Sequence, residues 1–137
     1  MKKKITLFFI LVLLLNTLWE FSHYPLYNDL SAITGNAHLI LASFTDVLWI
    51  GLIYFFVALF NKNLLWINKP SKTEYGLFIF GALLLAILVE IINLSLGRWS
   101  YKESMPLLFG IGLSPLLQLA VTGIISLAIT RHLTKQR

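Results

Sequence analysis

The chain has 137 residues, of which 58% are hydrophobic and 12% are charged, whereas soluble domains carry about a quarter charged residues. This composition indicates a single integral membrane domain over residues 1–137, because four spans of about 20 residues use most of that length. The lack of cysteine excludes disulfides and thiol chemistry, and the net charge of +5 comes from short basic clusters beside apolar runs, a pattern that does not fit a nucleic-acid partner.

Four apolar stretches, at about 5–24, 39–60, 75–96 and 107–130, are expected to be membrane-spanning helices. The first follows Lys2–Lys4 in the manner of a secretory signal, but no small-x-small cleavage site comes after it, so we expect it to be retained. Continuous apolar runs must close their backbone hydrogen bonds internally, which favours helices. The predicted fold class is therefore all-α, a polytopic membrane bundle of about four transmembrane helices.

Basic residues predict the orientation of this bundle. Nine of the eleven Lys and Arg lie near the two termini and in the segment 61–74, and the other two are Arg98 and Lys102. Cytoplasmic loops carry an excess of Lys and Arg, so both the N-terminus and the C-terminus are predicted to be cytoplasmic. The predicted location is a cell membrane, as a multi-pass protein of the bacterial inner membrane.

Aromatic residues lie close to the predicted ends of the spans. Such residues commonly sit at the interface between membrane and water, where they anchor helix ends. The residues concerned are Trp19, Tyr24, Trp66, Tyr75, Trp99 and Tyr101.

Two carboxylates are expected deep in the outer half of the spans. At a rise of about 1.5 Å per residue, Asp46 and Glu90 lie roughly 12 Å and 9 Å inside the outer boundary. An ionisable group in a span costs roughly 2.5 to 3.5 kcal/mol, so we assign both a catalytic role in acid/base chemistry. The alternative is a structural ion pair or a protonated, hydrogen-bonded carboxyl group. The predicted substrate-binding residues are Asn16, Glu20, His23, Asn93, Arg98, Trp99, Tyr101 and Gln118.

These residues give every predicted helix one polar face, and in lipid such faces turn inward. The sequence therefore predicts a polar pocket in the outer-leaflet half of the bundle. For Asn16, Asn93 and Gln118 the alternative is hydrogen bonding between helices. For Glu20 and His23 the alternative is solvation at the interface.

Arg98 is the expected counter-ion of Glu90, because its guanidinium can bind a carboxylate with two hydrogen bonds. In that case Asp46 is expected to hold a proton at neutral pH, since burial disfavours the charged form. Pro115 is expected to kink the fourth helix, because it removes one backbone hydrogen bond and crowds the carbonyl of Ile111. No cofactor and no metal are expected, and no H-x-x-x-H spacing is present that would place two histidine ligands on one helix turn.

The segment 90–106, EIINLSLGRWSYKESMP, carries an acidic residue seven positions before a Gly-x-Trp-x-Tyr run. It resembles lycopene-cyclase-type membrane domains, small helical modules that act on long isoprenoids, although their Pro-x-Glu-Glu run is absent here. The chain otherwise resembles uncharacterised small four-span bacterial membrane proteins. The first resemblance implies that Glu90 protonates the substrate or stabilises a carbocation, with Trp99 and Tyr101 as aromatic faces.

Three functions stay open at this stage. The first is a pocket that binds or processes a lipid-like substrate, isoprenoids among them, and whether it catalyses a reaction is left open. The second is a non-enzymatic accessory subunit of a larger membrane complex. The third is a small proton- or cation-coupled transporter, built as a homo-oligomer. The expected partner is a membrane lipid or a lipidic small molecule, and the mostly apolar inner half argues against a transport path.

Overall fold

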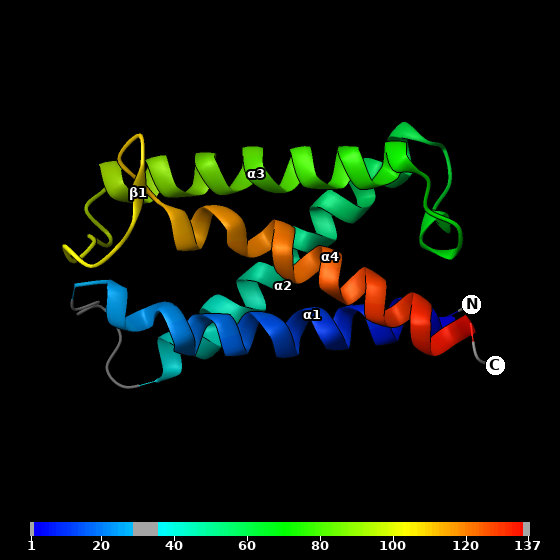
Figure 1. Cartoon of the computed structure of the whole chain (residues 1–137), viewed down its shortest axis with the longest axis horizontal. Coiled ribbons are helices and arrows are strands. Elements are labelled where there is room, and N and C mark those ends of the chain that lie inside the picture. The colour runs from blue at the N-terminus through cyan, green and yellow to red at the C-terminus, as the bar shows by residue number, and fades with distance from the viewer. Residues whose placement is uncertain (1, 29–35, 136–137) are drawn as a thin grey trace.

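The computed structural model describes residues 2–28 and 36–135, and four long helices form an antiparallel bundle in this part of the chain (Figure 1). They are α1 (Lys2–His23), α2 (Ala37–Phe60), α3 (Lys72–Ser95) and α4 (Leu113–Lys135). Each of them is long and apolar enough to cross a membrane. The prediction of an all-α fold with four such helices is confirmed.

The two ends of the bundle differ in what they carry. At one end, α1 begins, α4 ends and the connection between α2 and α3 passes, and we call this the terminal end (Figure 1). At the other, which we call the loop end, lie a short 3-10 helix η1 (Tyr24–Leu26) and the whole connection between α3 and α4. The basic clusters identified in the sequence therefore gather at the terminal end.

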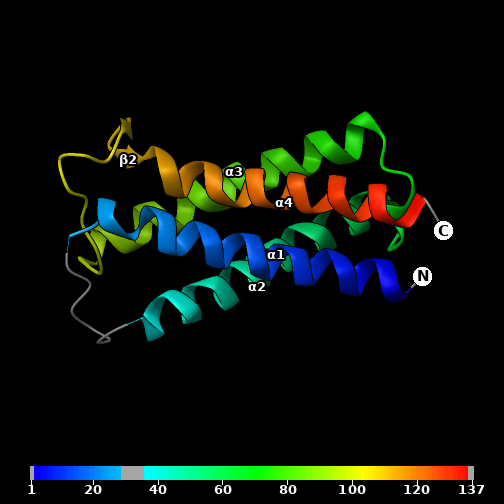
Figure 2. The same ribbon diagram turned by 60° about the horizontal axis from the view of Figure 1, so that its bottom comes forward.

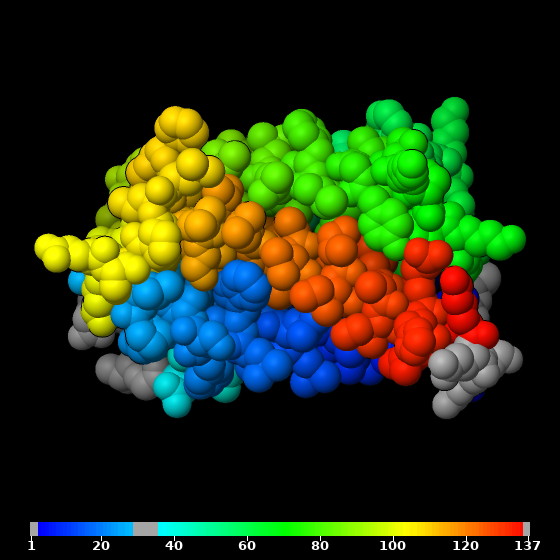
Figure 3. All heavy atoms as spheres, viewed as in Figure 1, coloured from blue at the N-terminus to red at the C-terminus, as the bar shows by residue number. Residues whose placement is uncertain are grey.

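Helix α4 lies between α1 and α3 on one face of the bundle, where side chains of the three helices are in contact (Figures 1 and 3). Helix α2 packs against α1 and crosses behind α4 (Figures 1 and 2). It lies near α1 at the loop end and near α3 at the terminal end. Helices α2 and α3 therefore separate toward the loop end.

The terminal end holds a dry apolar core. Phe8, Val57 and Phe78 are fully buried there, and Trp66, in the 3-10 helix η2 (Trp66–Asn68), is only 1% exposed. The indole nitrogen of Trp66 donates a 3.2 Å hydrogen bond to the carbonyl of Tyr54. Trp66 is therefore a core residue that packs within the protein.

Helix α3 begins three residues earlier than the apolar pattern suggests, because a capping box starts it. The Ser71 hydroxyl accepts a hydrogen bond from the Thr73 amide at 3.1 Å, and the Ser71 amide donates to Glu74 at 2.8 Å. These bonds satisfy amides that have no partner within the helix.

Helix α4 begins at Leu113, whereas the sequence predicted a start near 107. The intervening residues form a hairpin of β1 (Leu107–Leu108) and β2 (Ile111–Gly112), with positive φ at Phe109 and Gly110. The hairpin residues are as apolar as those of a membrane-spanning helix, so hydropathy alone does not show where the hairpin ends and α4 begins.

Pro115 consequently lies in the first turn of α4 and not in its interior. Amides in the first turn have no helical acceptor, so proline fits there without loss. Ile111, whose carbonyl was expected to be crowded, is in β2. The predicted kink is therefore wrong.

Close packing between α3 and α4 generates a prediction. A methyl group on Gly123 would lie 2.5 Å from two ring carbons of Phe78, whereas nothing lies within 4 Å of the same position on Gly76. We expect Gly123→Ala to lower the free energy of unfolding by about 1–3 kcal/mol through overpacking. Gly76→Ala should leave it unchanged or raise it by up to ~1 kcal/mol, because alanine favours helix. Denaturant unfolding in detergent, followed by circular dichroism, measures both; equal losses would contradict the prediction.

Candidate functional site

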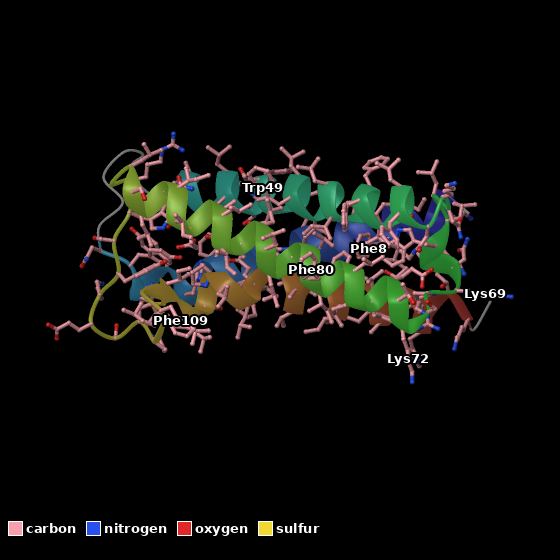
Figure 4. The ribbon with its side chains drawn as sticks, turned by 90° about the horizontal axis from the view of Figure 1, so that it is seen from above. Phe8, Trp49, Lys69, Lys72, Phe80 and Phe109 are labelled. Atoms are coloured by element: carbon pink, nitrogen blue, oxygen red, sulfur yellow. The ribbon has the colours of Figure 1, made fainter. Side chains whose placement is uncertain are left out.

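A cavity of about 600 Å³ lies at the loop end, with lining residues from all four helices. Leu41 of α2 lines it and is 58% exposed, so the cavity reaches the surface on the side where α2 and α3 separate. Figure 4 labels Trp49, a lining residue of the cavity, on α2. Of the predicted site residues, the cavity is lined by Glu20, His23, Asp46, Glu90, Asn93, Arg98, Trp99 and Gln118.

Glu20 and Asp46 form a pair of carboxyl groups that one amide holds together. The Gln118 side-chain nitrogen donates to Glu20 Oε1 at 2.7 Å and to Asp46 Oδ2 at 2.7 Å. The two carboxyl groups therefore lie next to each other at one amide nitrogen. Two adjacent carboxylates repel each other, so a proton on one of them is favoured because it removes one of the two charges. The pair is therefore built to hold one shared proton.

His23 stands on the other side of Glu20 and is fixed at both ring nitrogens. Its Nε2 lies 3.3 Å from Glu20 Oε2, and its Nδ1 lies 2.9 Å from the Ser114 hydroxyl oxygen. The indole nitrogen of Trp19 donates to the same hydroxyl at 3.1 Å. Glu20 and His23 are both at most 9% exposed, so neither is merely solvated at a surface.

Asn16 supports this arrangement from one helical turn below the cavity. Its carbonyl oxygen accepts hydrogen bonds from the Gln118 amide and the Thr122 hydroxyl, each at 3.2 Å, and its amide donates to the carbonyl of Val12 at 2.8 Å. Asn16 is fully buried and does not line the cavity. Of the two interpretations of Asn16, hydrogen bonding between helices therefore fits its position.

Glu90 forms a second acidic position in the same cavity. The Trp99 indole nitrogen donates to Glu90 Oε2 at 3.2 Å, and the Tyr101 hydroxyl donates to the same oxygen. The Arg98 guanidinium, in contrast, is exposed and donates to Asn93 Oδ1 at 3.1 Å. In the ranges that the structure covers, Glu90 forms no salt bridge with Lys or Arg. The expected Arg98–Glu90 ion pair is therefore wrong.

The turn after α3 explains why Trp99 and Tyr101 reach Glu90. Gly97 has φ +64°, a left-handed conformation that ends the helix, and the Arg98 amide bonds back to the Asn93 carbonyl at 3.0 Å. The chain then turns back over the helix end. Tyr101 is not a lining residue of the cavity, so its hydroxyl donates to Glu90 from outside the cavity.

Backbone bonds join this returning segment to the one after α1. Tyr27 and Tyr101 form an isolated antiparallel β-bridge, and the Asn28 amide donates to the Ser100 carbonyl at 2.9 Å. The rings of Tyr27 and Tyr101 are 5.5 Å apart. Burial raises the pKa of both phenols, so both stay neutral at physiological pH and Tyr101 stays a hydrogen-bond donor.

Asp46 and Glu90, placed at one depth by the sequence, do line one cavity, but they bond to different partners. Asp46 pairs with Glu20, a pairing that spacing along single helices did not indicate. Sequence reasoning also missed Tyr27, a buried lining residue, because a residue in a turn after Pro25 belongs to no periodic pattern.

A search of residues 2–28 and 36–135 finds no group of three or more His, Cys, Asp or Glu that could hold a metal ion. No family model, no curated protein and no solved structure matches the chain. The geometry of the cavity is therefore the basis on which a function is proposed.

The bond between Gln118 and Asp46 can be tested by a double-mutant cycle. Because the amide and the carboxyl are in direct contact, Gln118→Ala and Asp46→Ala should be non-additive in the free energy of unfolding by about 0.5–3 kcal/mol. Thr45 is the matched control, since its hydroxyl bonds to its own helix at Leu41. Gln118→Ala and Thr45→Ala should be additive within about 0.5 kcal/mol. Additivity of both pairs would show that the bond contributes nothing.

Proposed function

We propose that this protein crosses a membrane four times, with the loop end outside and both termini in the cytoplasm. The distribution of polarity supports insertion: Asn16 is fully buried, whereas Leu18 on the same helix is 65% exposed and Leu48 on α2 is 69% exposed. Such an inverted arrangement suits an apolar solvent. The basic residues at the terminal end support the orientation.

We further propose that the cavity binds a lipid-like amphiphile. The observation that carries this proposal is a cavity of about 600 Å³ that joins buried carboxyl groups to a surface opening between two apolar helices. This volume falls in the range of about 300–1,000 Å³ that small-molecule sites occupy. The apolar chain of a lipid enters between α2 and α3, and its polar end lies among Glu20, Asp46 and Glu90.

The same residues are suited to acid/base chemistry on the bound molecule. A carboxyl pair that shares one proton can give it to a substrate or take one back, which is general acid–base catalysis. In this proposal Asp46 and Glu90 are the acid/base groups, Gln118 positions the first, and Trp99 and Tyr101 position the second. An isoprenoid, the substrate class that the sequence resemblance implies, is one lipid of suitable shape.

The two competing functions are less well supported. An accessory subunit would leave its polar face open for a partner, but here Asn16, Glu20 and Gln118 are covered by helices of the same chain. A transporter needs a polar path through both halves. The terminal end is filled by the apolar core around Phe8 and Phe78.

The proposed orientation can be tested because the chain contains no cysteine. Single cysteines at Glu103, at the loop end, and Lys69, at the terminal end, should react differently with a membrane-impermeant maleimide added to intact cells. Glu103→Cys should be labelled at once, and Lys69→Cys only after the membrane is opened. The reverse pattern would overturn the orientation, and labelling of both in intact cells would overturn insertion.

Lipid binding can be tested by native mass spectrometry of the purified protein. We expect a co-purifying lipid in the wild type that is lost or reduced about tenfold or more in Asp46→Asn and Glu90→Gln, because each change removes a carboxyl group whose bond to the lipid head is worth about 1.5–3 kcal/mol. Glu103→Gln, an exposed acid outside the cavity lining, is the control and should retain the lipid. Equal retention by all three variants, with each still folded, would exclude the cavity as the binding site.

A further inference from the structure

We propose that the head of the bound amphiphile is a cation, an ammonium group that lies against Glu90 and the aromatic rings beside it. This inference rests on the proposed lipid-binding function and names the class of its ligand. Three features of the cavity carry it: the charge balance, the free oxygen of Glu90 and the aromatic wall.

The acidic groups of the cavity outnumber the cations that contact them. The Glu20–Asp46 pair shares a proton, and its remaining charge faces His23, which is the ion-pair partner of Glu20. Glu90 is 5% exposed, and Arg98, the nearest basic residue along the chain, bonds to Asn93 instead. A buried carboxylate without a counter-charge is costly, so a ligand cation would complete this site.

Glu90 also keeps one oxygen for a ligand. Both of its hydrogen bonds, from Trp99 and Tyr101, go to Oε2. Across the described ranges, Oε1 accepts no hydrogen bond from a side chain, although Glu90 lines the cavity. An ammonium group is a donor of the kind that this oxygen can accept.

Aromatic rings line the same cavity. Tyr27 and Trp99 both line the cavity, with ring centroids 6.4 Å apart and ring planes at 89°, so together they make a corner. Tyr24 and Trp49 line it as well. Aromatic faces attract cations within about 6 Å of the ring centroid. A phosphate or sulfate head beside Glu90 would instead meet a carboxyl group and ring faces, which repel it, while Arg98, a basic residue of the lining, bonds to Asn93.

The test compares two probes that differ only in the head: dodecylammonium, whose N–H groups can donate to Glu90, and an uncharged dodecyl ether of ethylene glycol. Each is titrated into the purified full chain in an uncharged maltoside detergent, and binding is followed by tryptophan fluorescence, since Trp49 and Trp99 line the cavity. We expect the cationic probe to bind about tenfold more tightly than the uncharged one, the size of one charged hydrogen bond.

Glu90→Gln should abolish the preference for the cation, and Glu103→Gln should keep it. Tyr27→Leu, which removes one ring and leaves Glu90 in place, should reduce the preference severalfold and serves if Glu90→Gln does not fold. Equal binding of both probes to the wild type, or an unchanged preference in Glu90→Gln, would overturn the cation while leaving lipid binding intact. Binding of neither probe would overturn the lipid-binding function as well.

Discussion

The side-chain amide of Gln118 joins three helices at one point, because its nitrogen lies 2.7 Å from a carboxyl oxygen on α1 and 2.7 Å from one on α2. Water stabilises charged groups wherever it reaches them, but Glu20 is 9% exposed and must find its partners within the protein. The amide, the shared proton and His23 supply them. Asn16 belongs to the same cluster, because its side-chain oxygen accepts a hydrogen bond from Gln118.

A second constraint closes the loop end. Helix α3 stops at Gly97, and the chain returns so that Trp99 and Tyr101 donate to Glu90. The returning segment is joined to the residues after α1 by backbone bonds. Four helices are therefore tied at this end by hydrogen bonds, while at the opposite end they are tied by the packing of rings such as Phe8 and Phe78.

Much of this arrangement is readable from the sequence. Long apolar runs must be helical, so the four helices were predictable, and each helix showed its polar face through spacing of three or four residues. Contacts across helices were not readable. No local sequence pattern predicts that Asp46 lies beside Glu20. Nor does one predict that the turn at Gly97 directs Arg98 away from Glu90. The hairpin before α4 was missed because Leu107, Leu108 and Ile111 are as apolar as the helix itself.

The difference between the two ends of the bundle has a consequence for how the sequence can change over evolution. Around Phe8 and Phe78 a residue is constrained by volume, so one apolar side chain can replace another when total size is kept. Around Gln118 each residue is constrained by its donors and acceptors, so a replacement of equal size still fails when a bond is lost. Permitted substitutions in this chain are therefore set by side-chain volume in one half of the helices and by hydrogen bonding in the other half.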